Sequence, residues 1–215
     1  MHHYLFILLT AHLLISSSQA LEWTESDKLT EAFVDRGVTG TFVLLEPESG
    51  SLTVHNPDRA QTPYVPASTY KIPNTLIGLS TGAASSVDEV LPYGGKPQPI
   101  KEWEQDMSLR DAIVVSNLPV YQGLARKIGL ERMQNALTEF HYGNARTGEI
   151  VDQMWLQGPL KISAFEQCQF LARLAKFELP AAREHQEAVH EITILESKGQ
   201  SVLHGKTGWA TSPDP

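Results

Sequence analysis

The sequence predicts an α+β fold, in which a helical middle lies between β-prone segments at the two ends of the chain. Short β-prone runs occupy residues 39–45 and 51–54, and strand character returns at residues 201–209. Between them, from Pro66 to about Leu179, the pattern is helical in several short pieces. This order indicates a sheet assembled from both ends of the chain.

The composition is that of an ordinary globular domain, with 41% hydrophobic and 20% charged residues among 215. This length suits one domain or a pair of small interleaved ones. Asp and Glu number 25 against 17 Lys and Arg, so the formal net charge is -8. An acidic chain without a basic run is a poor nucleic-acid binder, and we exclude that class of partner.

The first twenty residues predict a cleavable signal peptide, because they contain no Asp, Glu, Lys or Arg and residues 5–15 are mostly apolar. This run is too short to span a bilayer, which needs about 20 residues. Ser18 and Ala20 offer the small residues that a signal peptidase requires. We therefore expect a signal peptide over 1–20, a periplasmic location and no membrane attachment after cleavage. A buried N-terminal helix is the alternative.

The two N-terminal β-prone runs predict a hairpin, since the sequence "EPESG" between them has turn chemistry. The first helix is expected from Pro73 to about Ser80, because proline fits the first position of a helix and not its interior. Farther along, Ser108 caps the segment "LRDAIVV" and Pro119 starts the segment "VYQGLARKIG".

A further helix begins after Ser163, which forms a capping box with Glu166. This helix contains Cys168, the only cysteine of the chain, so the sequence has no disulfide framework. Apolar residues recur around Cys168 at helical spacing, which favours a small core residue. A reactive thiol is the alternative.

The stretch "VPASTYKIPNT" places Ser68 and Lys71 three residues apart. In a helix or a 3₁₀ turn, side chains at this spacing share a face and can meet. Ser68 would lie in the irregular first turn of a helix, where the peptide dipole stabilises negative charge, and this suits a nucleophile. A Ser-x-x-Lys pair also arises by chance, and alone it is more often a solvated surface pair.

Three further short motifs follow in chain order, "SNLP", "YGN" and "KTG". The first is a corner between two helices, the second is a turn, and the third closes a strand with a glycine that lets backbone approach a ligand. Each also has a purely structural reading: a helix cap, turn chemistry or a solvated strand end. Together they are hard to obtain by accident. Their candidate residues are Ser116, Tyr142, Gly143, Asn144, Lys206, Thr207 and Gly208.

With these motifs, the sequence resembles the penicillin-recognising serine enzymes, and most closely the class D, oxacillinase-type β-lactamases. The resemblance lies in "PASTYKIPN", "SNLPVYQGLARKIG", "FHYGN", "WLQGPLKISAFEQ" and "HGKTG", and covers nearly all of the mature chain. It implies a helical domain packed on a helix-flanked antiparallel sheet, with the active site in the cleft between them. It also implies hydrolysis of β-lactam antibiotics through a serine acyl-enzyme, and hence antibiotic resistance.

By analogy with this family, Ser68 matches the nucleophile, and Lys71 matches the lysine that reacts with CO2 to become a carbamate general base. Ser116 matches the serine that passes a proton to the lactam nitrogen. Burial lowers the pKa of a lysine, and only a neutral amine attacks CO2. The apolar setting of Lys71 is therefore a condition of the mechanism. The resemblance implies no metal and no cofactor beyond this carboxylation.

The remaining roles are also carried over from the family. Lys206 and Thr207, followed by the glycine of the same motif, match the group that binds the substrate carboxylate. Trp155 matches the tryptophan whose indole N–H holds the carbamate. The backbone N–H groups of Ser68 and Ala210 would form an oxyanion hole for the lactam carbonyl.

Two departures from the family pattern stand out. Leu118 replaces the usual valine two residues after Ser116. It stays apolar, which preserves the setting that favours the carbamate beside Trp155, and we expect it to shift the substrate profile. The chain also stops at Pro215, whereas the family continues with further strands, a substrate-binding arginine and a closing helix. We therefore interpret residues 21–215 as an incomplete domain that is part of a longer enzyme. As a freestanding product, we expect it to be unstable and nearly inactive.

Three other readings stay open. In these readings, the chain is either a non-hydrolytic β-lactam sensor, a peptidoglycan transpeptidase or carboxypeptidase, or an inactive fragment. A metal-dependent hydrolase is disfavoured, because the eight histidines form no H-E-x-x-H pattern, and His185 and His190 lie in a charged stretch that indicates surface residues. The expected partner is a small β-lactam, and homodimer formation is left open.

Overall fold

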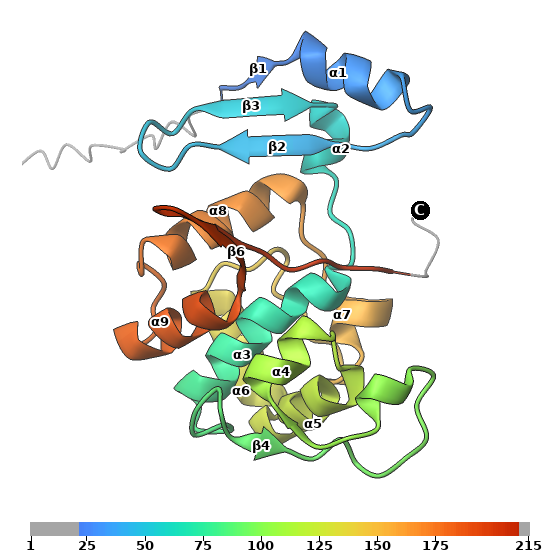
Figure 1. The fold of residues 1–215 in the computed structure, drawn as a ribbon, viewed down its shortest axis with the longest axis vertical. Coiled ribbons are helices and arrows are strands. Elements are labelled where there is room, and N and C mark those ends of the chain that lie inside the picture. The colour runs from blue at the N-terminus through green and yellow to red at the C-terminus, as the bar shows by residue number, and fades with distance from the viewer. Residues whose placement is uncertain (1–21, 211–215) are drawn as a thin grey trace, which may run out of the picture.

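A small N-terminal sheet lies on a helical body in the computed structural model, which describes residues 22–210 (Figure 1). Its strands are β1 (Thr24–Glu25), β2 (Phe42–Leu45) and β3 (Leu52–His55), in the order β1-β3-β2. The antiparallel pairing of β2 with β3 confirms the predicted hairpin. Side chains alternate along β3, so Leu52 and Val54 are buried towards helix α8 (Ala164–Ala175) while Thr53 and His55 lie on the side of helix α1 (Asp27–Val34).

The helices follow one another with short connections. They are α1 (Asp27–Val34), α2 (Pro57–Gln61), the 3₁₀ turn η1 (Ala67–Tyr70), α3 (Lys71–Ser80), the 3₁₀ turn η2 (Lys101–Trp103), α4 (Leu109–Val114), α5 (Leu118–Ile128), α6 (Leu130–Glu139), α7 (Met154–Gln157), α8 (Ala164–Ala175) and α9 (Arg183–Ile192). A two-stranded ladder joins β4 (Val90–Leu91) to β5 (Met107–Ser108). Together, these helices and the sheets make an α+β fold, as the sequence predicted.

Helix α3 is the centre of the helical body (Figure 1). Nine of its ten residues are buried, because it packs against both α5 and α9 and its sequence is apolar on nearly all sides. The lack of a side chain at Gly78 lets Leu124 of α5 approach closely. Helix α3 is therefore a rigid platform for the residues at its N-terminus.

The predicted helix starts are confirmed at three places. Ser108 caps α4, Ser163 and Glu166 form a capping box at α8, and α5 begins one residue before Pro119. The predicted start of α3 at Pro73 is wrong. The turn η1 runs directly into α3, so the helix begins at Lys71 and Pro73 takes the third position, where no backbone N–H is needed.

A second antiparallel hairpin ends the described chain, and consists of β6 (Ile194–Lys198) and β7 (Ser201–His204). The prediction of a strand through residue 209 is too long, since the ladder ends at His204. The prediction of one sheet built from both ends is also wrong for residues 22–210, where this hairpin and the N-terminal sheet are separate. Sequence patterns show which segments are extended, but they do not fix which edges pair.

Two predictions about single residues have clear outcomes. Cys168 of α8 is half-buried where this helix faces β2. Burial raises the pKa of its thiol, which supports a packing role over a reactive one. The prediction that His185 and His190 lie on the surface is wrong, since both are half-buried. The ring of His190 stacks on that of His204, with centroids 3.7 Å apart. Between residues 22 and 210, no helix is long and apolar enough to cross a membrane.

Candidate active site

Ser68 and Lys71 meet at the junction of η1 and α3. The Lys71 Nζ donates a hydrogen bond to the Ser68 Oγ at 3.0 Å, so the predicted contact is present. The turn is bent by Ala67, whose φ of 48° lies in the left-handed region that residues with a Cβ rarely adopt. It is held by Thr69, whose backbone N–H and hydroxyl both donate to the carbonyl of Pro66. Backbone strain of this kind is concentrated at functional sites.

Lys71 is buried, with 1% of its surface exposed. Loss of hydration and, to a lesser extent, the positive charge of Lys206 lower the pKa of Lys71 from its usual value to about 7. The ring of Tyr121 lies 5.3 Å from the Nζ and offers the charged form only weak compensation. At neutral pH, a large fraction of Lys71 is therefore an uncharged amine.

Trp155 lies in α7, which packs against η1, and it is completely buried. Its ring stacks on the ring of Tyr70, with the two centroids 5.1 Å apart. Tyr70 directly precedes Lys71 in the chain. The Trp155 Nε1–H is buried and has no acceptor among residues 22–210. Leaving such a donor unpaired costs about 1–3 kcal/mol. The orphaned donor indicates that an acceptor group belongs in this part of the site.

Ser116 stands at the corner between α4 and α5. Its φ of 55° is left-handed, which is unusual for a residue with a Cβ. The buried Asn117 follows and caps α5, because its Oδ1 accepts a hydrogen bond from the Val120 N–H at 3.1 Å. Leu118 is half-buried at the first position of α5 and packs against the main core. The corner is thus tightly constrained on the side of α5.

The segment Lys206 to Gly208 lies against the turn that carries Ser68. A Cβ added at Gly208 would stand 3.0 Å from the Thr69 Cγ2 and 3.1 Å from the Pro66 carbonyl oxygen, so only glycine allows this approach. Lys206 is half-buried, which lowers its pKa. Its charge also acts on Lys71, which places both cations in one site.

The exposed side of this segment borders a cavity. Thr207 and Ala210 are exposed, and Lys206 and Thr207 line a cavity of about 350 Å³ together with α4. The other lining residues are Ile113, Val114, Ile192, Ile194, Leu195 and Gly205. The helix that leads to Ser116 and the segment that contains Lys206 therefore share one groove.

The motif Tyr142, Gly143 and Asn144 supports a neighbouring loop. Asn144 donates to the Pro159 carbonyl at 2.8 Å and accepts from the Lys161 N–H at 3.1 Å. Tyr142 is buried, and its hydroxyl bonds to Gln167, while Gly143 adopts a φ of 53°. These contacts agree with the turn-chemistry reading of the motif. They brace the segment that directly follows α7 and thereby Trp155.

Several residues around Lys71 were not predicted. Tyr70 stacks on Trp155 and Tyr121 lies beside the Lys71 Nζ, and the Tyr121 hydroxyl hydrogen-bonds the Thr75 hydroxyl at 2.9 Å. Thr75 follows Lys71 by four residues in α3, so helical spacing gives a signal for this position. Nothing local in the sequence indicates that Tyr121, on another helix, comes beside the lysine.

Comparisons with known proteins agree on one family. The family described as Penicillin binding protein transpeptidase domain matches residues 40–215. Beta-lactamase OXA-5 of Pseudomonas aeruginosa is 44% identical over 200 residues, covering 92% of this chain and 75% of its own length. Beta-lactamase OXA-10 of the same organism is 41% identical over 197 residues, covering 92% and 74%.

A solved structure gives the same result. The crystal structure of FUS-1 (OXA-85), a class D beta-lactamase from Fusobacterium nucleatum subsp. polymorphum, matches with a TM-score of 0.85 and 46% sequence identity. The match covers 87% of this chain and 78% of that one.

Proposed function

The chain belongs to the class D β-lactamases, serine enzymes that hydrolyse β-lactam antibiotics, and we propose that it does so with Ser68 as nucleophile and an N-carboxylated Lys71 as general base. The observation that carries this proposal is a buried lysine with a pKa of about 7, hydrogen-bonded to Ser68, near an indole N–H that has no acceptor in the described part of the chain. A general base needs to be unprotonated and within hydrogen-bond reach of the group it activates, and the geometry here meets the second requirement.

The surroundings of Lys71 fit carboxylation in two ways. The uncharged amine is the form that attacks CO2, and burial keeps this form populated at neutral pH. The charge of Lys206 destabilises an ammonium at Lys71 and would stabilise an anion there. Trp155 would hold the carboxylated lysine through its Nε1–H, for which residues 22–210 offer no other acceptor. The modification supplies an anionic oxygen base beside Ser68.

The other groups bind the substrate and move one proton. Ser68 loses its hydroxyl proton to the base at Lys71 as its oxygen attacks the lactam carbonyl. The backbone N–H groups of Ser68 and Ala210 would polarise that carbonyl. Ser116 passes a proton to the lactam nitrogen as the carbon–nitrogen bond breaks. Lys206 and Thr207 bind the substrate carboxylate, which offsets the charge of Lys206.

A combined kinetic and mass measurement tests the acyl-enzyme. We expect the full-length protein to hydrolyse a chromogenic cephalosporin, and quenched reactions to show an acyl adduct on Ser68 that disappears as product forms. Ser68→Ala serves as the control and shows neither the adduct nor product. An adduct that persists without product release would contradict hydrolysis and favour a non-hydrolytic sensor.

The replacement at position 118 bears on substrate choice. Leu118 begins α5 two residues after Ser116 and is half-buried, so its extra methylene changes the space next to the site. We expect Leu118→Val to alter the ratio of kcat/KM values between a penicillin and a cephalosporin. The matched control is Leu130→Val on α6, where the side chain is 40% exposed. Equal ratios for both variants and the parent would remove this role for Leu118.

Export to the periplasm is a separate part of the proposal. It rests on the signal-peptide pattern of residues 1–20, which lie outside the residues that the structure describes. Sequencing the N-terminus of the periplasmic protein tests it, and we expect the mature chain to begin near residue 21. An N-terminus that retains the first twenty residues would contradict it.

A further inference from the structure

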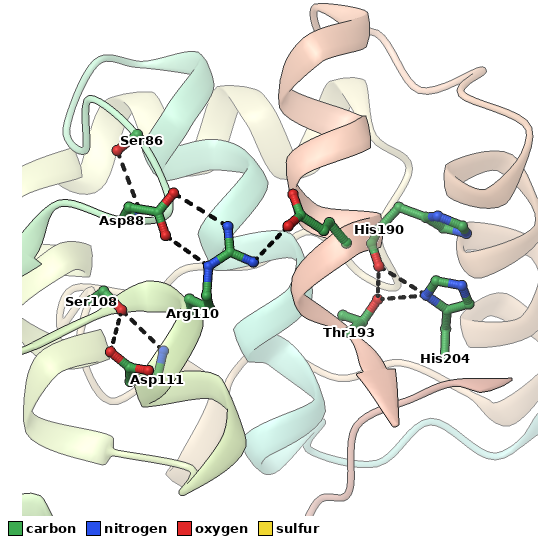
Figure 2. Close-up of polar contacts among 9 residues, drawn as sticks. Ser86, Asp88, Ser108, Arg110, Asp111, His190, Thr193 and His204 are labelled. Atoms are coloured by element: carbon green, nitrogen blue, oxygen red, sulfur yellow. Dashed lines mark hydrogen bonds and ion pairs between the residues drawn. The ribbon is translucent and has the colours of Figure 1, made fainter. Parts of the chain in front are cut away.

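Helix α4, which leads to Ser116, is anchored at its N-terminus. Ser108 caps the helix by accepting a hydrogen bond from the Asp111 N–H at 3.1 Å. Arg110 donates to both carboxylate oxygens of Asp88 and to Glu191 of α9, at distances from 2.7 to 3.2 Å (Figure 2). The start of α4 is thus tied to the loop between α3 and β4 and to α9. The remaining freedom of Ser116 depends on the C-terminal end of the helix.

That C-terminal end is bound to Trp103. The Trp103 Nε1–H donates a hydrogen bond to the Val115 carbonyl at 2.9 Å. Val115 is the C-cap of α4 and directly precedes Ser116. The last carbonyls of a helix have no partner inside the helix, so an outside donor fixes where the chain goes next.

The residue after Ser116 is also bound to Trp103. The buried side chain of Asn117 donates through Nδ2 to the Trp103 carbonyl at 3.4 Å, and its backbone N–H donates to the Ala112 carbonyl at 2.8 Å. Trp103 therefore contacts both neighbours of Ser116, one through its indole and one through its backbone. A left-handed residue between two such contacts cannot relax without breaking one of them.

We propose that Trp103 is a positioning residue for Ser116, and that its indole N–H holds the strained corner in the conformation that aims the Ser116 hydroxyl at the lactam nitrogen. This inference rests on the role of Ser116 in the proposed function. Ser116 acts when the carbon–nitrogen bond breaks. The contribution of Trp103 therefore belongs to acylation and not to hydrolysis of the acyl-enzyme, which depends on the base at Lys71.

The test separates these two steps in the full-length chain. Trp103→Phe keeps an aromatic ring and removes the donor. We expect single-turnover acylation by a cephalosporin to slow about tenfold, the effect of losing one hydrogen bond of ordinary strength. Deacylation and the response to bicarbonate should stay unchanged. Trp23→Phe is the matched control, since Trp23 packs on Phe165 beneath the N-terminal sheet, and its acylation rate should equal that of the parent.

A double-mutant comparison distinguishes positioning from general destabilisation. In a Ser116→Ala background, Trp103→Phe should change acylation less than twofold, because the group it positions is absent. A tenfold loss in that background, a parallel loss in deacylation, or unchanged acylation in the parent background would overturn the proposal. If Trp103→Phe folds poorly, β-(3-benzothienyl)alanine at position 103 replaces the indole N–H with sulfur in a ring of the same shape, and the same results are expected.

The two single variants, Ser116→Ala and Trp103→Phe, distinguish a failure of this inference from a failure of the proposed function. If Ser116→Ala alone leaves acylation unchanged, the role of Ser116 fails and the inference fails with it. If Ser116→Ala slows acylation while Trp103→Phe does not, only the inference is contradicted.

Discussion

Lys71 shows how a residue's environment determines its chemistry. A solvated lysine is charged at neutral pH, whereas this side chain is buried with a second cation nearby, and its pKa falls to about 7. The matching feature is the buried Trp155 Nε1–H, which has no acceptor among the residues that the structure describes. Each feature alone is costly, and a carboxylated lysine would relieve both.

The lowered pKa predicts how carboxylation depends on pH. Lys71 is protonated below about pH 7, where the reactive neutral fraction decreases about tenfold for each pH unit. We expect an enzyme stripped of CO2 to regain activity faster as the pH rises through 7, with little further gain above about pH 8. Recovery is measured at constant dissolved CO2. A rate that still rises tenfold per unit above pH 8 would show that the pKa of Lys71 is not lowered.

At the scale of single residues, the sequence predicted the contact between Ser68 and Lys71, because spacing along one turn is a local property. It did not predict the left-handed φ of Ser116, or that Tyr121 of α5 lies beside the lysine. Those features arise from the packing of helices that are far apart in the chain. No local pattern encodes them.

At the scale of elements, capping residues were the most reliable signals. Ser108 and Ser163 mark helix starts because a side-chain oxygen and the N–H groups of the first turn lie within a few residues of each other. The end of β7 at His204 was not predictable, since a strand ends where its partner stops. The brace formed by Tyr142, Gly143 and Asn144 was likewise predicted only as a turn.

Substitution of Gly143 tests that brace. Gly143→Ala would place a Cβ 2.1 Å from the Lys161 carbonyl oxygen, in addition to the strain of a φ of 53°. Gly37→Ala is the matched control, with a φ of 60° and nothing within 4 Å of the added Cβ. We expect the control to cost about 1–2 kcal/mol of unfolding free energy. The Gly143 variant should cost about 1–3 kcal/mol more.

Chemical denaturation of both glycine variants supplies these free energies. Activity follows the same order, because the braced segment directly follows the helix that carries Trp155. Equal losses in the two variants would mean that the close approach of the loop to Gly143 is not needed for stability.

At the scale of the whole molecule, the site is assembled from distant parts of the chain. The 3₁₀ turn and α3 supply Ser68 and Lys71, the corner after α4 supplies Ser116, α7 supplies Trp155, and the segment after β7 supplies Lys206 (Figure 1). Arg110 links α4 to α9, the helix that leads into β6 (Figure 2). Lys206 also gives the site a positive charge in a chain of net charge -8, which suits an anionic substrate.

The central claim is that Lys71 is carboxylated, and ¹³C NMR of the full chain in labelled bicarbonate tests it most directly. We predict one carbamate signal that is absent in Lys71→Ala and weakened in Trp155→Phe, a variant that keeps the aromatic contact with Tyr70 but lacks the indole N–H. An active enzyme that gives no carbamate signal and works equally well without bicarbonate would contradict the account.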